Sequence, residues 1–251
     1  MNAKLKENKH LGLACVRSFL RSYFVGAGFN TRGLQNIGFS YAMQPGLEAI
    51  YKNPEDLSKA RRRYVKHYNS HPFWGPLLIA IFLSIEMQIE AGNFPVALLD
   101  KVKNTTSYTL SAIGDSVFAG SALIFWALAT VSLLLAGLQT QALLLGFTSL
   151  VGLQVFKVYT FWAGINKGLS FLDELKKWSL INWGERLKFG NAVVLLVIWA
   201  QLWPEGANMF QWYGGAATLG LLGWLIGTGK ISREIVAVLF VVVSLFIIKF
   251  I

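Results

Sequence analysis

A long uncharged run directly after a single carboxylate is the feature that most constrains the fold. Residues 116–138 contain no charged side chain, and Asp115 immediately precedes them. The apolar run is expected to end only at Gly137. At about 1.5 Å per helical residue, this run covers the roughly 30 Å of hydrocarbon in a bilayer. The sequence therefore predicts a membrane-spanning helix and an integral membrane protein.

Asp115 has two interpretations at the level of sequence, and both stay open. Together with Gly114 it stands where the spanning helix would begin, so it is a natural N-cap. It is also a polar group near the membrane, where such groups often serve ligands or partners. Ala112, Ser116 and Gly120 are spaced four apart and would leave a groove for close helix packing.

The composition agrees with a polytopic membrane protein. Only 14% of the 251 residues are charged and 54% are hydrophobic, whereas about a quarter of the residues in soluble domains are charged. The net charge is +10, and residues 1–70 hold twelve Lys or Arg against four acidic residues. The positive-inside rule places this segment in the cytoplasm. Contact with anionic lipid is favoured over nucleic-acid binding.

The sequence carries no recognisable catalytic or metal-binding pattern. Cys15 is the only cysteine, and none of the three histidines is paired with a cysteine or carboxylate at metal-ligand spacing. A P-loop and a nucleophile elbow are both absent. We therefore expect no catalysis, metal or cofactor, and no cleavable signal peptide is evident.

Residues 1–71 are predicted to form a basic, cytoplasmic or interfacial helical region. An amphipathic helix, suited to the membrane interface or to a partner, is indicated by apolar residues at three- and four-residue spacing: Leu13, Val16, Leu20 and Phe24. A bend is expected at 26–33, and Pro45 with Gly46 is expected to break or restart the next helix.

A helix start is predicted at Asn53 and Pro54, where a cap residue precedes a proline. The helix should run to about Tyr68. Its buried stripe is expected to contain Leu57, Ala60, Tyr64 and Tyr68. Its basic residues are expected to face water or lipid phosphate: Arg61, Arg62, Arg63 and Lys66.

Residues 72–251 are predicted to form the membrane domain of an all-α integral membrane protein. The apolar stretch at 73–91 is too short to cross a bilayer, so we expect a re-entrant helical hairpin there. A cytoplasmic loop is expected at 166–188, Lys157 is expected to snorkel to the interface, and the C-terminus is expected outside. About five spans are predicted, near 116–138, 142–163, 191–203, 212–228 and 234–251.

Polar groups at membrane level are the candidate site residues. Besides Asp115, Glu86 and Glu90 qualify, although they could also form a re-entrant tip that reaches water. His71, Asn69 and Gln35 could bind sugar hydroxyls or satisfy the backbone at helix ends. Gly223 and Gly227 belong to a second small-residue face, for which helix packing is the favoured role.

Several blocks of sequence occur together in a characteristic order. They are Arg17-Ser-Phe-Leu20, the segment from Asn30 to Met43, Tyr68-Asn-Ser-His-Pro-Phe73, Glu86, and Ile113-Gly-Asp-Ser-Val-Phe118. In these blocks, over about residues 17–125, the chain resembles one known family, the IID subunit of the mannose/fructose/sorbose-type sugar phosphotransferase permease.

The resemblance implies a subunit of the bacterial inner membrane that pairs with a IIC membrane subunit and assembles further. The pair would carry a hexose, while separate IIA and IIB proteins pass phosphate to the sugar. His71 would then be structural or close to the sugar and would not carry phosphate.

The sequence departs from the family pattern after Asp115. A Trp-Gly-x-x-Arg-Pro segment is usual there, but residues 119–124 read Ala-Gly-Ser-Ala-Leu-Ile. This departure motivates a second hypothesis, a degenerate IID homologue that acts as a scaffold or regulator without binding sugar. A membrane enzyme acting on lipid headgroups is the third and least supported hypothesis.

Overall fold

The computed structural model describes residues 9–203, 208–232, 234–239 and 241–242, and these residues confirm the all-α class. They form two compact units, Met1–Ile198 and Trp199–Ile251, which we treat separately. The elements of the first unit are α2 (Lys9–Arg21), η1 (Ser22–Gly28), α3 (Asn36–Ile50), α4 (Pro54–Tyr64), α5 (Gly75–Glu90), α6 (Val96–Gly114), η2 (Asp115–Ala122), α7 (Leu123–Leu135), α8 (Gln139–Lys167), α9 (Ser170–Lys177) and most of α10 (Leu180–Gln201).

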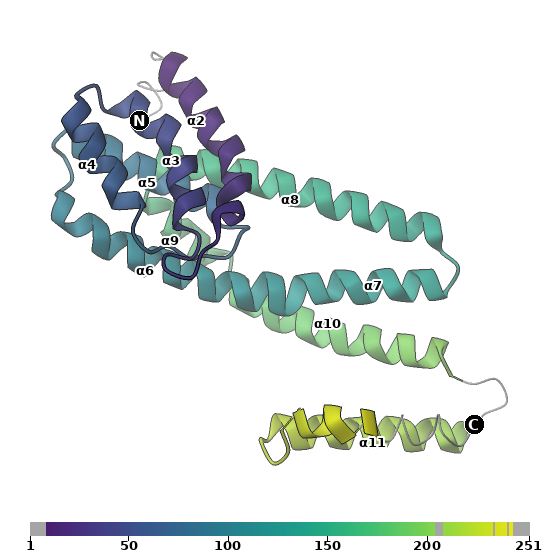
Figure 1. Ribbon diagram of the computed structural model, residues 1–251. Helices are drawn as coiled ribbons and strands as arrows, with labels where there is room; N and C mark the ends of the chain where they lie inside the picture. Colours follow the sequence, from purple (N-terminus) through teal and green to yellow (C-terminus); the bar gives the residue numbers. More distant parts are fainter. Residues whose placement is uncertain (1–8, 204–207, 233, 240, 243–251) are drawn as a thin grey trace. The chain divides into compact units, whose positions relative to one another are not determined.

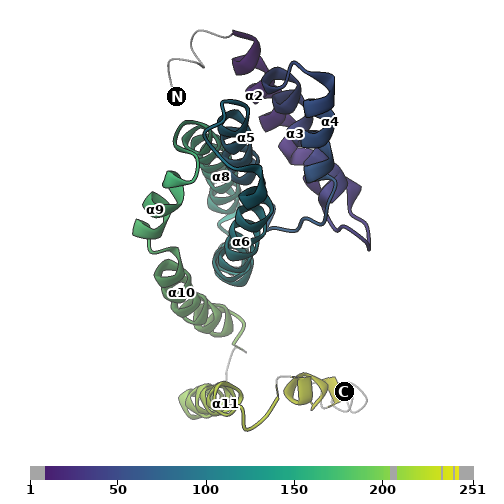
Figure 2. The ribbon, with the colours of Figure 1, turned by 90° about the vertical axis from the view of Figure 1, so that its left-hand side faces the viewer.

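Helix α5 is the centre of the first unit (Figures 1 and 2). Every residue from Gly75 to Glu86 is buried, and α5 packs against α3, α6 and α8. A helix that is apolar on all sides must be enclosed in this way. Gly164 lacks a side chain, so α8 can approach α5 closely at Leu77 and Ala80. Residues 73–91 thus contain one helix, and its predicted re-entry into the membrane stays a prediction.

The N-cap interpretation of Asp115 is wrong, because one continuous helix of 40 residues runs from Val96 to Leu135. Gly114 has ordinary helical angles, and the backbone N–H of Asp115 already donates to Ala112 and Ser111. Residues Asp115–Ala122 are wound as a π-helix. Such segments are rare and occur frequently at functional sites.

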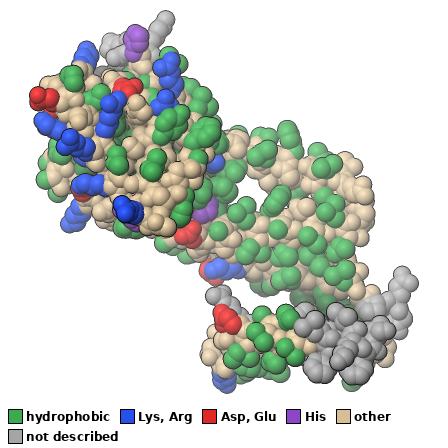
Figure 3. Space-filling model, in the orientation of Figure 1, with side chains coloured by type: hydrophobic (Ala, Val, Ile, Leu, Met, Phe, Trp, Pro, Cys, Tyr) green, Lys and Arg blue, Asp and Glu red, His purple; other side chains and the backbone are tan. Residues whose placement is uncertain are grey.

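Helices α7 and α8 form a long antiparallel hairpin whose turn contains Gly137 at φ +73°, where the sequence predicted the end of the apolar run. Among the described residues, two helices are long and apolar enough to cross a membrane, Val96–Leu135 and Gln139–Lys167. They include the first predicted span as far as Leu135 and the whole of the second, 142–163. No residue of α7 is buried, and Figure 3 shows hydrophobic side chains over this region, with basic side chains gathered over the α2–α4 end.

Pro45 does not break α3, contrary to the prediction, because α2 supplies the missing hydrogen bonds. A proline removes one helical donor and displaces the carbonyl four residues earlier. Here the carbonyl of Tyr41 accepts from Arg21 Nη1 at 3.3 Å. The N–H of Gly46 donates to the hydroxyl of Ser18 at 3.2 Å.

The predicted start of α4 is confirmed, since the side chain of Asn53 accepts from the N–H of Glu55 at 2.9 Å and Pro54 begins the helix. The helix ends at Tyr64, earlier than expected, because residues 65–70 turn to pair with the loop before α3.

The predicted cytoplasmic loop at 166–188 is largely helical, since α9 and the start of α10 occupy it. In the second unit, α11 (Met209–Gly227) begins with a capping box between Asn208 and Gln211. The expected breaker at 204–206 and most of the predicted last span at 234–251 lie outside the described residues. The number of spans beyond the hairpin stays a prediction.

Candidate functional site

The sequence blocks that carry the family resemblance meet in space around the loop before α3. Asn30 shapes this loop, because its side-chain oxygen accepts from the backbone N–H groups of Arg32 and Gly33. Leu34 then pairs with Tyr68 as a parallel bridge, and the N–H of Gln35 donates to the carbonyl of Tyr68 at 2.9 Å. The structure thus joins two blocks that lie more than thirty residues apart.

Glycines allow the closest approaches between these blocks. A side chain on Gly38 would collide with the backbone of Phe24 and Val25 in η1, and one on Gly114 would collide with His71. The Gly-Asp-Ser block of the long helix therefore packs directly against the turn that contains His71.

His71 lies at the centre of an aromatic cluster at this junction. Its ring stacks on Phe118, with centroids 5.4 Å apart, and meets the ring of Phe73 edge-on at 4.9 Å. Its Nδ1 atom accepts from the N–H of Phe73 at 3.3 Å. The neutral ring then carries its proton on Nε2, which can donate to a ligand.

Burial lowers the pKa of His71, and the positive charge of Lys157 acts in the same direction, while the charge of Asp115 opposes the shift. His71 is therefore neutral at pH 7, so its ring presents one N–H donor and one nitrogen acceptor.

The structure brings together some of the predicted site residues. Asp115 is exposed beside the His71 cluster. The side-chain oxygen of Gln35 accepts from the N–H of Ser70, so it fixes the turn that precedes His71. Asn69 is half-buried and lines a small pocket with Lys103 and Tyr108.

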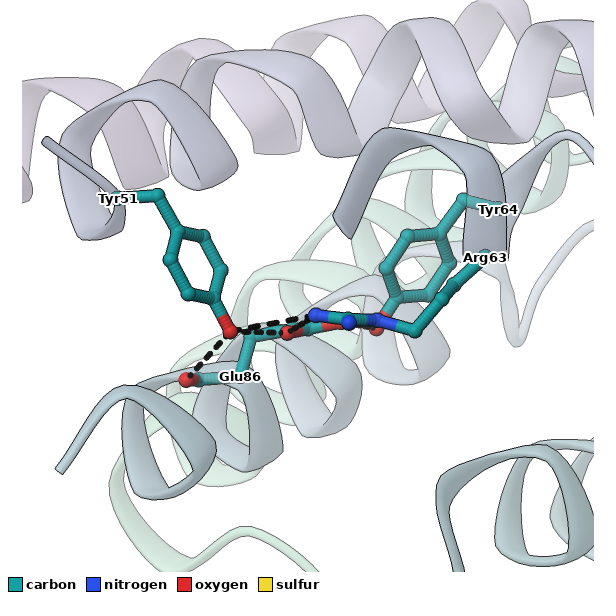
Figure 4. Close-up of polar contacts among 4 residues, drawn as sticks. All are labelled: Tyr51, Arg63, Tyr64 and Glu86. Carbon is teal, nitrogen blue, oxygen red and sulfur yellow. Dashed lines mark hydrogen bonds and ion pairs between the residues drawn. The ribbon is translucent and has the colours of Figure 1, made fainter. Parts of the chain in front are cut away.

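Glu86 lies apart from this cluster, in a buried network on α5 (Figure 4). Its side chain is 0% exposed, and Arg63 donates to it from Nε at 3.0 Å and from Nη2 at 2.5 Å. The hydroxyls of Tyr51 and Tyr64 donate to it at 2.6 and 2.8 Å. Four donors therefore surround one carboxylate, and none comes from α5 itself.

The network also affects the groups that surround Glu86. Burial and the neighbouring carboxylate raise the pKa of the Tyr51 and Tyr64 hydroxyls, so both act as donors. Burial alone would lower the pKa of Arg63, but the hydrogen bond and charge of Glu86 outweigh it and raise the pKa. Lys103 donates to the carbonyl of Arg63 at 2.7 Å, which holds the end of α4 against α6. This geometry favours a structural role for Glu86 over contact with substrate.

Arg63 is the residue that the sequence analysis placed wrongly, since it was expected to face water or lipid. A lone carboxylate in an apolar run signals that a cation must lie nearby. The sequence offers many basic residues, however, and their spacing does not identify the partner.

Lys157 does not snorkel to an exposed surface, because it is only 9% exposed. Its ammonium lies 4.6 Å from the ring centroid of Tyr23 and 5.4 Å from that of Phe73. The rings attract the cation electrostatically, so the side chain turns toward η1.

The groove predicted at Ala112, Ser116 and Gly120 lies partly in the π-helical segment, and no other helix of the described chain fills it at Gly120. Within the described chain, a side chain on Gly120 would meet only the carbonyl of Asp115. Helix α10 packs instead near Val117 and Ser121, where Asn191 donates to the carbonyl of Ser121 at 3.2 Å. Ala112 is exposed and Ser116 is half-buried, while open space surrounds Gly223 and Gly227, so their packing against a partner stays a prediction.

Comparisons with known proteins show which family this chain is similar to. A family model described as "PTS system mannose/fructose/sorbose family IID component" matches residues 13–196. The chain is 28% identical over 105 residues to the "PTS system mannose-specific EIID component" of Escherichia coli K12, covering 41% of this chain and 37% of that protein. It is 25% identical over 161 residues to the "PTS system sorbose-specific EIID component" of Klebsiella pneumoniae, covering 64% and 59%.

Two solved structures share the fold. A chain described only as a membrane protein aligns with a TM-score of 0.65 at 20% identity, covering 95% of this chain and 96% of that one. A chain from the cryo-EM structure of the mannose transporter ManYZ with microcin E492 aligns with a TM-score of 0.53 at 20% identity, covering 92% and 94%.

The all-α fold and the long apolar hairpin define a helical membrane protein. The family match covers most of the chain. The chain belongs to the mannose/fructose/sorbose family of phosphotransferase-system IID components, and the resemblance inferred from the motifs is confirmed.

Proposed function

We propose that this chain pairs with a IIC subunit to form the membrane channel of a phosphoenolpyruvate-dependent sugar phosphotransferase system. The substrate is a hexose of the mannose/fructose/sorbose class, and phosphoryl transfer takes place on separate IIA and IIB proteins. The observation that carries the proposal is the meeting of the family's sequence blocks at His71 and Gly114.

A donor and acceptors at one junction suit the hydroxyl groups of a sugar, which both donate and accept hydrogen bonds. His71 offers an Nε2–H donor, and Asp115 offers carboxylate acceptors on the exposed side of the same junction. Gln35 positions the turn, and Asn69 is a further amide near it. The names of relatives also support the substrate class, since they include mannose- and sorbose-specific components and a fructose permease.

The partner is inferred from the exposed apolar surface and from the solved relatives. No residue of α7 is buried within this chain, and one similar structure is a transporter complex named ManYZ. We infer a complex in the bacterial inner membrane with the N-terminus in the cytoplasm, the C-terminus outside, and a higher oligomer of the IIC–IID pair. Its remaining spans are α10, α11 and the last predicted span.

The proposal is tested by co-expressing this chain with the IIC protein of the same genome and purifying the complex in detergent. We expect a stable complex that binds a hexose, and we expect Asp115→Ala to abolish sugar binding while the complex still assembles. Failure to assemble would contradict the proposal.

The scaffold hypothesis rests on the sequence at 119–124, where the usual Arg-Pro is missing. It predicts a complex that assembles and binds no hexose, so the same experiment separates the two functions.

A further inference from the structure

Helix α2 has apolar side chains on two sides, one facing the core and one exposed. Leu11 and Cys15 face the core and are 9% and 1% exposed, whereas Leu20 is 57% exposed. The core face accounts for one apolar row, so the exposed row needs another explanation. We call this exposed row the α2 stripe, which consists of Leu13, Val16 and Leu20 of α2 and Phe24 of η1. An apolar row of this kind marks a surface that meets a partner or a membrane.

The position of η1 places the α2 stripe relative to the hairpin. The hydroxyl of Tyr23 donates to the side chain of Gln154, and the ammonium of Lys157 lies over the Tyr23 ring. From Gln139 to Lys157 the helix rises about 27 Å, close to the hydrocarbon thickness of a bilayer. On the other helix, Ser116 to Leu135 spans about 30 Å, and Asp115 precedes it. Lys157 and Asp115 therefore mark one level at which both helices leave the hydrocarbon, and η1 lies at that level.

The direction of α2 is compatible with this placement. Figure 1 shows α2 inclined to the length of α7 and α8, so α2 does not continue the bundle of spanning helices. A helix inclined to the spanning helices can rest an exposed apolar row in the membrane interface.

The charged and aromatic residues around the α2 stripe indicate which kind of surface the stripe contacts. Arg17 is exposed beside Leu13 and Leu20, and the segment 1–70 has a large excess of basic residues. Tyr23 and Tyr41 are exposed near the C-terminal end of α2, and aromatic rings of this kind favour the level of the lipid headgroups. We propose that α2 is an in-plane anchor whose apolar stripe rests in the interface of an anionic phospholipid membrane.

The test uses nitroxide labels on the full chain in nanodiscs, with and without the IIC partner. Single cysteines are introduced as Leu20→Cys and Phe24→Cys, and Lys59→Cys on exposed α4 serves as the control. The native Cys15 is buried, and burial raises the pKa of its thiol to about 11, so it stays unlabelled at neutral pH. Treating the chain that has no introduced cysteine with the same label measures any labelling of Cys15.

The measured quantity is the ratio of collision rates with oxygen, which enters lipid, and with a water-soluble nickel chelate. We expect this ratio to be several-fold higher at positions 20 and 24 than at position 59, with a larger difference in phosphatidylglycerol than in phosphatidylcholine. A ratio at 20 and 24 equal to that at 59 would overturn the proposal. Protection from both reagents only when IIC is present would assign the stripe to the partner, and equal ratios in the two lipids would overturn the anionic selectivity.

Discussion

At the scale of single residues, breaking the buried ion pair between Arg63 and Glu86 is expected to destabilise the protein strongly. Glu86→Gln leaves the guanidinium of Arg63, only 16% exposed, without a counter-charge. Removing one partner of a buried pair typically costs about 3–5 kcal/mol. We therefore expect a loss of about this size, measured by chemical unfolding of the detergent-solubilised protein.

Two controls separate the buried charge from a general effect of mutation. In an Arg63→Met background, Glu86→Gln should cost much less, because no unpaired guanidinium remains. Lys59→Ala breaks the exposed pair with Asp56 and should change stability by about 1 kcal/mol or less. Equal losses in both Arg63 backgrounds would contradict the assignment of the network.

His71 is expected to make stability depend on pH below neutrality. Its pKa is lowered in the folded state, so between that value and the unfolded value of about 6.5 the unfolded chain binds more protons. The contribution of neutral His71 is complete above pH 6.5 and is lost as the pH falls through this window. Thermal unfolding from pH 8 to pH 5 should show a steeper loss for the native chain than for His71→Gln, and identical pH profiles would argue against a buried neutral ring.

At the scale of elements, the continuity of α3 through Pro45 is expected to depend on α2. Ser18→Ala removes the acceptor of the buried Gly46 N–H, and an unsatisfied buried donor costs about 1–3 kcal/mol. In a Pro45→Ala background the N–H of residue 45 is restored and Gly46 can bond within the helix, so the cost of Ser18→Ala should fall. A double-mutant cycle measures this coupling. Strictly additive losses would show that the hydroxyl of Ser18 does not compensate for Pro45.

The elements that the sequence predicted well are those whose signals are local. Asn53 and Pro54 predicted the start of α4, and Gly137 predicted the end of the apolar run. The errors arose where a distant partner decides the outcome. Pro45 is tolerated because Ser18 and Arg21 lie against it.

The candidate site shows the same difference between local signals, which were read correctly, and contacts with distant residues, which were not. The sequence named His71 and Asp115 separately as candidate site residues, but it did not predict that their blocks meet, because the contact through Gly114 depends on the tertiary fold. The helix through Asp115 could not be predicted, because Gly114 and Asp115 are as suitable for a helix start as for a tightly packed helix interior. Arg63 was not identifiable because its partner Glu86 lies 23 residues away on another helix.

At the scale of the whole molecule, the exposed side of the π-helical segment is expected to hold the partner subunit. Gly120 meets no other helix within the described chain, yet it lies on the long spanning helix beside exposed Ala119. Gly120→Leu would place a bulky side chain where a partner helix must approach closely, so we expect the complex with IIC to be lost. Ala136→Leu, exposed at the end of α7 and on the opposite side of the helix from Gly120, should be tolerated. Co-purification with tagged IIC measures both, and normal assembly of Gly120→Leu would place the partner on another face of the hairpin.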